Sequence, residues 1–163
     1  CGLTERTIDA LIAAEHIRGL RHICFWDNKL GDAAAKLFSS HHMRSLEEIY
    51  LNGVGLSGEA LAKELGKLDF DSPLRKLGVQ SNPIGDKGAS AIATNPHLPY
   101  LGTCYLYGGN IGESGVIALA NSPNLKRVSY LHLGNKPGSE EGREALIESP
   151  YLPAAIRREW IAE

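Results

Sequence analysis

An internal period of 26 to 28 residues constrains the fold of this chain more than any other feature. The frame L-x-x-L-x-L/V-x-x-N-x-I/L-G-D/E recurs at five places, which begin at Leu20, Leu46, Leu74, Leu101 and Val128. Within each unit the apolar residues first alternate and then adopt helical spacing, so each unit predicts a strand, a tight turn and a helix. Because one such unit cannot bury its apolar face alone, successive units must stack.

The residues of this frame resemble the leucine-rich repeat family, and within it the ribonuclease-inhibitor-like subtype. The resemblance rests on the strand residues Ile49-x-Leu51, Leu77-x-Val79, Leu106 and Leu131-x-Leu133, with Asn28 and Asn82 at the turn. A turn asparagine can satisfy backbone groups that are left free where the strand bends. Three links, Asn95-Pro96-His97-Leu98, Ser122-Pro123-Asn124-Leu125 and Ser149-Pro150-Tyr151-Leu152, are similar to those of short bacterial arrays. The resemblance implies an α/β solenoid, a horseshoe or right-handed superhelix with a parallel sheet on its concave face and helices on its convex face.

The repeat frame also predicts how the chain is divided. We expect one domain over residues 1–163, with a partial repeat helix at 1–19, about five repeats at 20–149 and a C-terminal capping helix at 150–163. Ile156 and Trp160 are four residues apart and so share one face of this last helix. Small residues recur at one helix position, where they let helix and sheet approach closely: Ala34, Ala60, Gly88, Gly115 and Gly142. Residues 67–71 break the pattern and predict an irregular, solvent-facing bulge.

Composition excludes several classes of function. The net charge is −2 and the pI is near 6.3, so the chain lacks the basic stripe that is typical of nucleic-acid binders. No apolar run is long enough to cross a bilayer and no signal-peptide pattern is present, so we expect a cytoplasmic protein that does not bind a membrane. The three cysteines, Cys1, Cys24 and Cys104, have neither disulfide-type nor zinc-type spacing. Cys104 occupies the inward strand position of Ile23, Ile49 and Leu77, so we predict a core thiol there. As an alternative, Cys1 could carry the lipid anchor of a processed lipoprotein; a fragment boundary also explains its position.

Two motifs invite a chemical interpretation. Gly53-Val54-Gly55-Leu56-Ser57-Gly58 is a literal G-x-G-x-x-G, which is typical of dinucleotide binding, but the repeat frame places a turn there in every unit. His41 and His42, with Cys24 nearby in sequence, suggest a metal or a nucleophile. Adjacent histidines point in different directions, however, so we expect solvated residues in a link. We therefore predict no catalytic residue, no cofactor and no metal, and a protein that is not an enzyme.

The face of the sheet opposite the helices holds the remaining candidates. Aromatic residues recur among the strand positions that point there. Tyr and Trp combine apolar area with a hydrogen-bonding tip, and they are enriched where proteins bind each other. The predicted partner-binding residues are Trp26, Tyr50, Tyr105, Tyr107, Tyr130 and His132. Because Gly78 interrupts the row, the patch could have two parts. A simpler explanation is that aromatic residues favour strands and cover neighbouring backbone.

These features together predict a protein-binding module that contacts an unidentified protein partner through the concave sheet. Tyr105 and Tyr107 are the expected anchors. One alternative is a regulator that acts on an enzyme in trans, as leucine-rich GTPase-activating proteins act on a GTPase. Another is a structural segment of a larger protein whose chemistry lies in a different domain.

Overall fold

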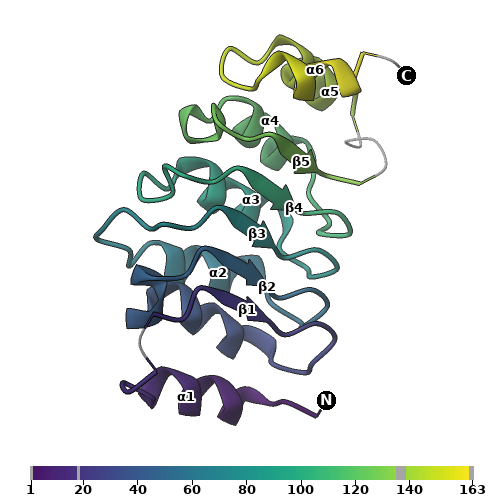
Figure 1. Cartoon of the computed structure of the whole chain (residues 1–163). Coiled ribbons are helices and arrows are strands. Elements are labelled where there is room, and N and C mark those ends of the chain that lie inside the picture. Colours follow the sequence, from purple (N-terminus) through teal and green to yellow (C-terminus); the bar gives the residue numbers. More distant parts are fainter. Residues whose placement is uncertain (1, 18, 135–138, 162–163) are drawn as a thin grey trace.

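A computed structural model describes residues 2–17, 19–134 and 139–161 and shows an α/β fold (Figure 1). Residues 135–138, where the repeat frame expects the turn of the last unit, and Cys1, the alternative site of a lipid anchor, lie outside the described residues. Five short strands are β1 (His22–Cys24), β2 (Glu48–Tyr50), β3 (Lys76–Gly78), β4 (Thr103–Tyr105) and β5 (Tyr130–His132). The α-helices are α1 (Glu5–Ala13), α2 (Gly58–Leu65), α3 (Gly85–Thr94), α4 (Glu113–Ala120), α5 (Glu140–Glu148) and α6 (Ala154–Glu159). Three segments are 3-10 helices: η1 (Gly31–Ser39), η2 (His41–Arg44) and η3 (Pro123–Leu125).

The strands form one parallel sheet in the order β1-β2-β3-β4-β5, so each repeat contributes one strand and pairs with its sequence neighbours. Equivalent residues pair across the whole sheet: Ile23, Ile49, Leu77, Cys104 and Leu131 form one row. The helices cover one face of the sheet and leave the other open (Figure 1). Residues at the same position of successive repeats are therefore neighbours across the sheet.

The core lies between the sheet and the helix layer. The inward strand residues Ile49, Leu77 and Leu51 are fully buried. Cys104 is buried at the equivalent position, and burial raises the pKa of its thiol to about 12. The prediction that Cys104 is a core thiol is thus confirmed, because a thiol with this pKa stays protonated and packs as a small apolar group.

Asn82 connects two repeats at the turn that follows β3. Its buried amide nitrogen donates to the carbonyls of Leu51 and Val79 at 2.7 and 2.9 Å, and its oxygen accepts from the N–H groups of Gly55 and Leu56 at 2.9 and 3.0 Å. Without the Asn82 side chain, these backbone groups would be buried between two repeats and would have no hydrogen-bond partner. The predicted role of the turn asparagine is confirmed at this position.

Acidic residues at two helix starts cap the helix of the following repeat. The carboxylate of Asp32 accepts from the N–H of Ser57 at 2.8 Å, just before α2. Asp86 accepts from the N–H of Gly112 at 2.5 Å and from the hydroxyl of Ser114 at 2.6 Å, at the start of α4. The hydrogen bond from Ser114 is the main reason that the pKa of Asp86 lies below its usual value. These contacts satisfy helix N-terminal groups and place negative charge where the helix dipole favours it.

Two expectations need correction. The alanine-rich segment after β1 is the 3-10 helix η1 and not an α-helix. Ala33, Ala34 and Ala35 are all buried there, where η1 packs on both α1 and α2. His42 is buried rather than solvated, because its ring Nε2 lies 2.9 Å from the carbonyl oxygen of Leu11.

Other local expectations are confirmed. The segment before β3 is irregular, as predicted for residues 67–71, although Leu68 is buried beneath it. At the C-terminal end, Ile156 and Trp160 are both buried where α6 packs on α5. The amphipathic pattern thus identified the inner face of this helix correctly.

Candidate functional site: the exposed face of the sheet

The sheet register brings the predicted site residues onto one surface. Cys24, Tyr50, Gly78, Tyr105 and His132 are paired in sequence across the five strands. On one side of this line, His22, Glu48, Lys76, Thr103 and Tyr130 form a second line. Side chains alternate between the two faces of a strand, so both lines point away from the helix layer. The predicted residues therefore share one face.

Six rings on this face form a continuous series of contacts, which we call the aromatic row. Its members, in order of contact, are Trp26, Tyr50, Tyr105, Tyr130, His132 and Tyr107. Ring centroids of consecutive members lie 6.4, 6.3, 5.3, 5.9 and 4.7 Å apart. These separations fall within the range of favourable aromatic pairs. Trp26 is 56%, Tyr130 41% and Tyr107 37% exposed, so the row presents apolar area to solvent.

Gly78 does not divide the aromatic row, which corrects the expectation of a two-part patch. The rings of Tyr50 and Tyr105 meet across β3 at a centroid separation of 6.3 Å. A Cβ atom at Gly78 would lie only 2.7 Å from Cδ1 of Tyr50. The missing side chain therefore provides the space in which the Tyr50 ring lies. At this position glycine is what makes the surface continuous.

Trp26 is held at one end of the aromatic row by two contacts. Its ring meets that of Tyr50 edge to face, with an angle of 84° between the ring planes. With the Asn52 amide turned so that its oxygen faces the indole, that oxygen accepts from the Trp26 Nε1–H at 2.6 Å, and the amide nitrogen donates to the Gly78 carbonyl at 3.2 Å. The indole is thus oriented while more than half of it stays exposed. A large side chain that is fixed before binding loses little conformational entropy when a partner covers it.

Charged residues flank the aromatic row at the start of the strands. The carboxylate of Glu48 lies 3.0 Å from the Lys76 ammonium and 3.6 Å from the His22 ring nitrogen, and it accepts from the Tyr50 hydroxyl at 3.2 Å. The hydrogen bond from Lys76 is the main cause that lowers the pKa of Glu48, and burial raises the pKa of Tyr50. This network keeps Glu48 ionised and ties Tyr50 to it, so the polar contacts also orient the aromatic row.

The glycine-rich motif has a structural explanation. Gly53 and Gly55 have φ angles of 62° and 84°, which glycine adopts at little cost. Gly58 is buried against the next repeat, where an added Cβ atom would lie 1.8 Å from the carbonyl oxygen of Ile84. A dinucleotide would place its pyrophosphate beside the start of this helix, where the next repeat already lies. The backbone conformation of the repeat turn and its packing on the next repeat therefore explain all three glycines.

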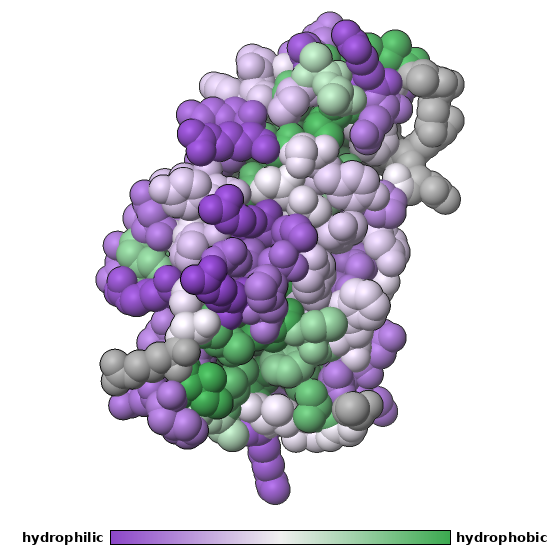
Figure 2. Space-filling view, viewed as in Figure 1, coloured by the Kyte–Doolittle hydropathy of each residue, from purple (hydrophilic) through white to green (hydrophobic). Residues whose placement is uncertain are grey.

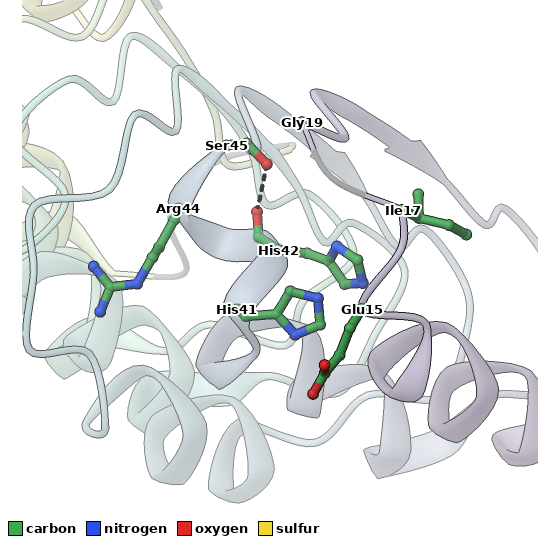
Figure 3. A pocket seen from close by; sticks show the side chains of 7 residues that line it. All are labelled: Glu15, Ile17, Gly19, His41, His42, Arg44 and Ser45. Atoms are coloured by element: carbon green, nitrogen blue, oxygen red, sulfur yellow. Dashed lines mark hydrogen bonds between the residues drawn. The ribbon is translucent and has the colours of Figure 1, made fainter.

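His41 and His42 line an open hollow of about 460 Å³ between the link after α1 and the 3-10 helix η2 (Figure 3). The two rings are 4.0 Å apart, and the Ser45 hydroxyl donates to the His42 carbonyl at 3.2 Å. Within the part of the chain that the structure describes, no three His, Cys, Asp or Glu side chains are placed to hold a metal ion. In the same part, no helix has the length and apolar character needed to span a membrane.

Comparison with known proteins gives one finding on the family. A family model described as Leucine Rich repeat matches residues 71–93, which include β3 and most of α3. The match supports a leucine-rich repeat family. Repeats of this type are in general non-catalytic modules that bind proteins. A comparison with curated proteins found no match.

Proposed function

We propose that this protein is a binding module, without catalysis of its own, that contacts a protein partner through the exposed face of its sheet. The aromatic row is the observation that supports this function. Its rings touch one another over the whole sheet, and three of them are more than a third exposed. Exposed aromatic residues in a contiguous, preoriented patch are the usual centre of a protein interface.

The same proposal includes the arrangement of the chain. One domain of about five repeats would form a solenoid of the ribonuclease-inhibitor-like subtype, with its sheet on the concave side and α6 as the C-terminal cap. The parallel order of the strands and the helix layer on one face support it. A solenoid offers its inner surface to a partner as one extended area.

The test is capture of partners from source-cell lysate with three folded forms of the protein, followed by mass spectrometry. The site variant is Tyr105→Ala/Tyr107→Ala, which opens the aromatic row near β4. The matched control is Tyr100→Ala/Tyr151→Ala, because Tyr100 and Tyr151 are 47% and 41% exposed but have no ring contact with the row.

The expected result is a protein that the wild type and the control capture and the site variant loses. Binding should weaken by at least about tenfold, because an aromatic hot-spot residue contributes about 2 kcal/mol or more. Circular dichroism must show that all three forms are folded. Equal recovery of every partner by the site variant and the wild type would contradict a role for the exposed sheet face.

A further inference from the structure

Charged residues at the strand starts alternate in sign over the first three strands. Backbone hydrogen bonds align the residues that directly precede the five strands, which are Arg21, Glu47, Arg75, Gly102 and Ser129. The carboxylate of Glu47 lies 2.9 Å from the Arg21 guanidinium and 4.0 Å from that of Arg75. One carboxylate before β2 is thus shared between a cation before β1 and a cation before β3.

The first residues of the strands show the same order, which stops at β4. Glu48 on β2 lies between His22 and Lys76, at 3.6 and 3.0 Å. The equivalent positions at β4 hold the neutral residues Gly102 and Thr103. The two cations at β3 therefore have a carboxylate on the β2 side and none on the β4 side.

Cations without a partner lie beyond β4, in the link before β5. Lys126 and Arg127 are exposed, and neither forms an ion pair with a described residue. From residue 87 to residue 139 the sequence contains one acidic residue, Glu113, which begins α4 in the helix layer. The strands β4 and β5 and the links before them thus contain no acidic residue. Figure 2 shows strongly hydrophilic side chains on the side of this face where the strands of Figure 1 begin.

Gly102 leaves open space between the two groups of cations. Outside its adjacent residues, the atom nearest to a Cβ placed at Gly102 would be the Arg75 carbonyl oxygen, at 3.7 Å. The hydroxyl groups of Thr103 and Tyr130 form no hydrogen bond with a described residue, so each is available to donate to a ligand. Tyr130 also belongs to the aromatic row and is 41% exposed. The place over Gly102 therefore favours an anion that is next to an apolar group.

We propose that the protein partner presents an acidic side chain over Gly102, next to an apolar side chain that contacts the aromatic row. This inference rests on the proposed binding function and specifies the chemistry of the partner segment. A carboxylate there would lie between the cations of β3 and those before β5, as Glu47 lies between Arg21 and Arg75. It would continue the alternation of charge across the sheet, and complementary charge of this kind fixes the orientation of a partner.

Single-stranded nucleic acid also combines negative charge with rings that stack on aromatic side chains. A phosphate chain that followed the aromatic row, however, would pass the carboxylates of Glu47 and Glu48 at β2. The protein also has a net charge of −2 and a pI near 6.3. A protein segment can place one carboxylate at β4 and apolar or neutral residues elsewhere. The distribution of charge therefore favours an acidic protein segment over a polyanion.

The matched substitutions Gly102→Glu and Gly102→Gln test the site without a partner. The φ angle of Gly102 is not in the left-handed region, so the backbone accepts both side chains. The introduced carboxylate should act as that of the partner does. The melting midpoint of Gly102→Glu should therefore exceed that of Gly102→Gln by about 1 to 3 °C at low salt, and high salt should reduce the difference. An equal or lower midpoint for Gly102→Glu would overturn the proposal, because no anion would then be favoured at β4.

Random peptides displayed on phage are the probe for the partner, because they assume nothing about its sequence. We expect the selected peptides to carry an acidic residue close to an aromatic or aliphatic one. Their affinity should fall about tenfold for Arg127→Glu, which replaces attraction by repulsion. The control Arg6→Glu makes the same change of net charge on α1, in the helix layer, and should bind as the wild type does. Gly102→Glu should also lose these peptides, since its own carboxylate fills the site.

The same selection separates this inference from the function on which it rests. Peptides without acidic residues that lose binding to Tyr105→Ala/Tyr107→Ala would overturn the inference and leave the binding function in place. Peptides that are unaffected by Tyr105→Ala/Tyr107→Ala and by Arg127→Glu would contradict both. Selection of no peptide would overturn the inference as well. So would tight binding of a single-stranded oligothymidine that Arg127→Glu weakens, because the ligand would then be a nucleic acid.

Discussion

The substitution Gly78→Ala tests whether the aromatic row depends on the absence of a side chain in β3. The φ angle of Gly78 is not in the left-handed region, so the backbone accepts alanine without strain. The new Cβ atom would lie 2.7 Å from Cδ1 of Tyr50 and 3.0 Å from the side-chain amide of Asn52, closer than ordinary contact allows. The Tyr50 ring must move, and its contacts with Trp26 and Tyr105 are then weakened.

The expected cost follows from these contacts. Two aromatic pairs contribute about 0.5–1.5 kcal/mol each, and alanine in a strand recovers about 0.5–1 kcal/mol relative to glycine. The free energy of unfolding should therefore fall by about 1 kcal/mol, which lowers the melting midpoint by about 2–4 °C for a domain of this size. A thermal melt followed by circular dichroism measures this shift, and the emission of Trp26 should change with it in the folded state.

The decisive comparison uses a background in which the ring is absent. In Tyr50→Ala, the added methyl group of Gly78→Ala meets no ring, so the substitution should be neutral or stabilising. A reversal of sign between the two backgrounds would show that the Tyr50 ring occupies the space over Gly78. The same loss of stability in both backgrounds would refute this reasoning, because the cost would then arise elsewhere.

Three further changes test the connections between repeats. Asn82→Ala should lower the free energy of unfolding by about 3–5 kcal/mol in a denaturant titration, because several buried backbone groups lose their partner; a loss below about 1 kcal/mol would contradict this. Gly115→Leu should cost about 1–3 kcal/mol by overpacking, since even a Cβ atom would lie 2.7 Å from Asp86 Oδ1, and an unchanged melt would refute it. The folded-state pKa of Asp86 is lowered, so its carboxylate stabilises the fold above the ordinary aspartate pKa, and that contribution disappears as pH falls through the lowered value. Asp86→Asn should therefore reduce the melting midpoint at pH 7, and the reduction should become smaller as pH falls below the ordinary aspartate pKa, whereas an effect independent of pH would argue against the carboxylate cap.

The sequence period predicted the features that depend on local pattern. It identified the strands, the inward position of Cys104 and the bonding role of Asn82, because each of these repeats at a fixed place in the frame. It also placed the aromatic residues on one face. Side-chain length decided the rest: at Gly78 the pattern indicated a gap, but the Tyr50 ring is long enough to meet Tyr105 across a whole strand. The spacing of the repeats does not show how far a side chain reaches.

Other differences arose from packing between elements that are distant in sequence. His42 is buried because its ring Nε2 lies within hydrogen-bond distance of the carbonyl oxygen of Leu11, 31 residues earlier. The 3-10 helix η1 packs on α1 and α2, which are distant from it in the sequence. In each case the contact joins residues of different repeats, and the pattern within one repeat does not predict it.

The carboxylates that cap helices across repeats give the unfolding of this protein a direction. Asp32 and Asp86 each hold the start of the helix in the repeat that follows, at Ser57 and Gly112. If the end with α1 frays first, loss of η1 removes the cap at the start of α2, and loss of α3 removes the cap at the start of α4. If the end with α6 frays first, the exposed carboxylates are simply hydrated and the remaining helices keep their caps. Loss of structure should therefore spread more readily from α1 towards α6 than in the opposite direction.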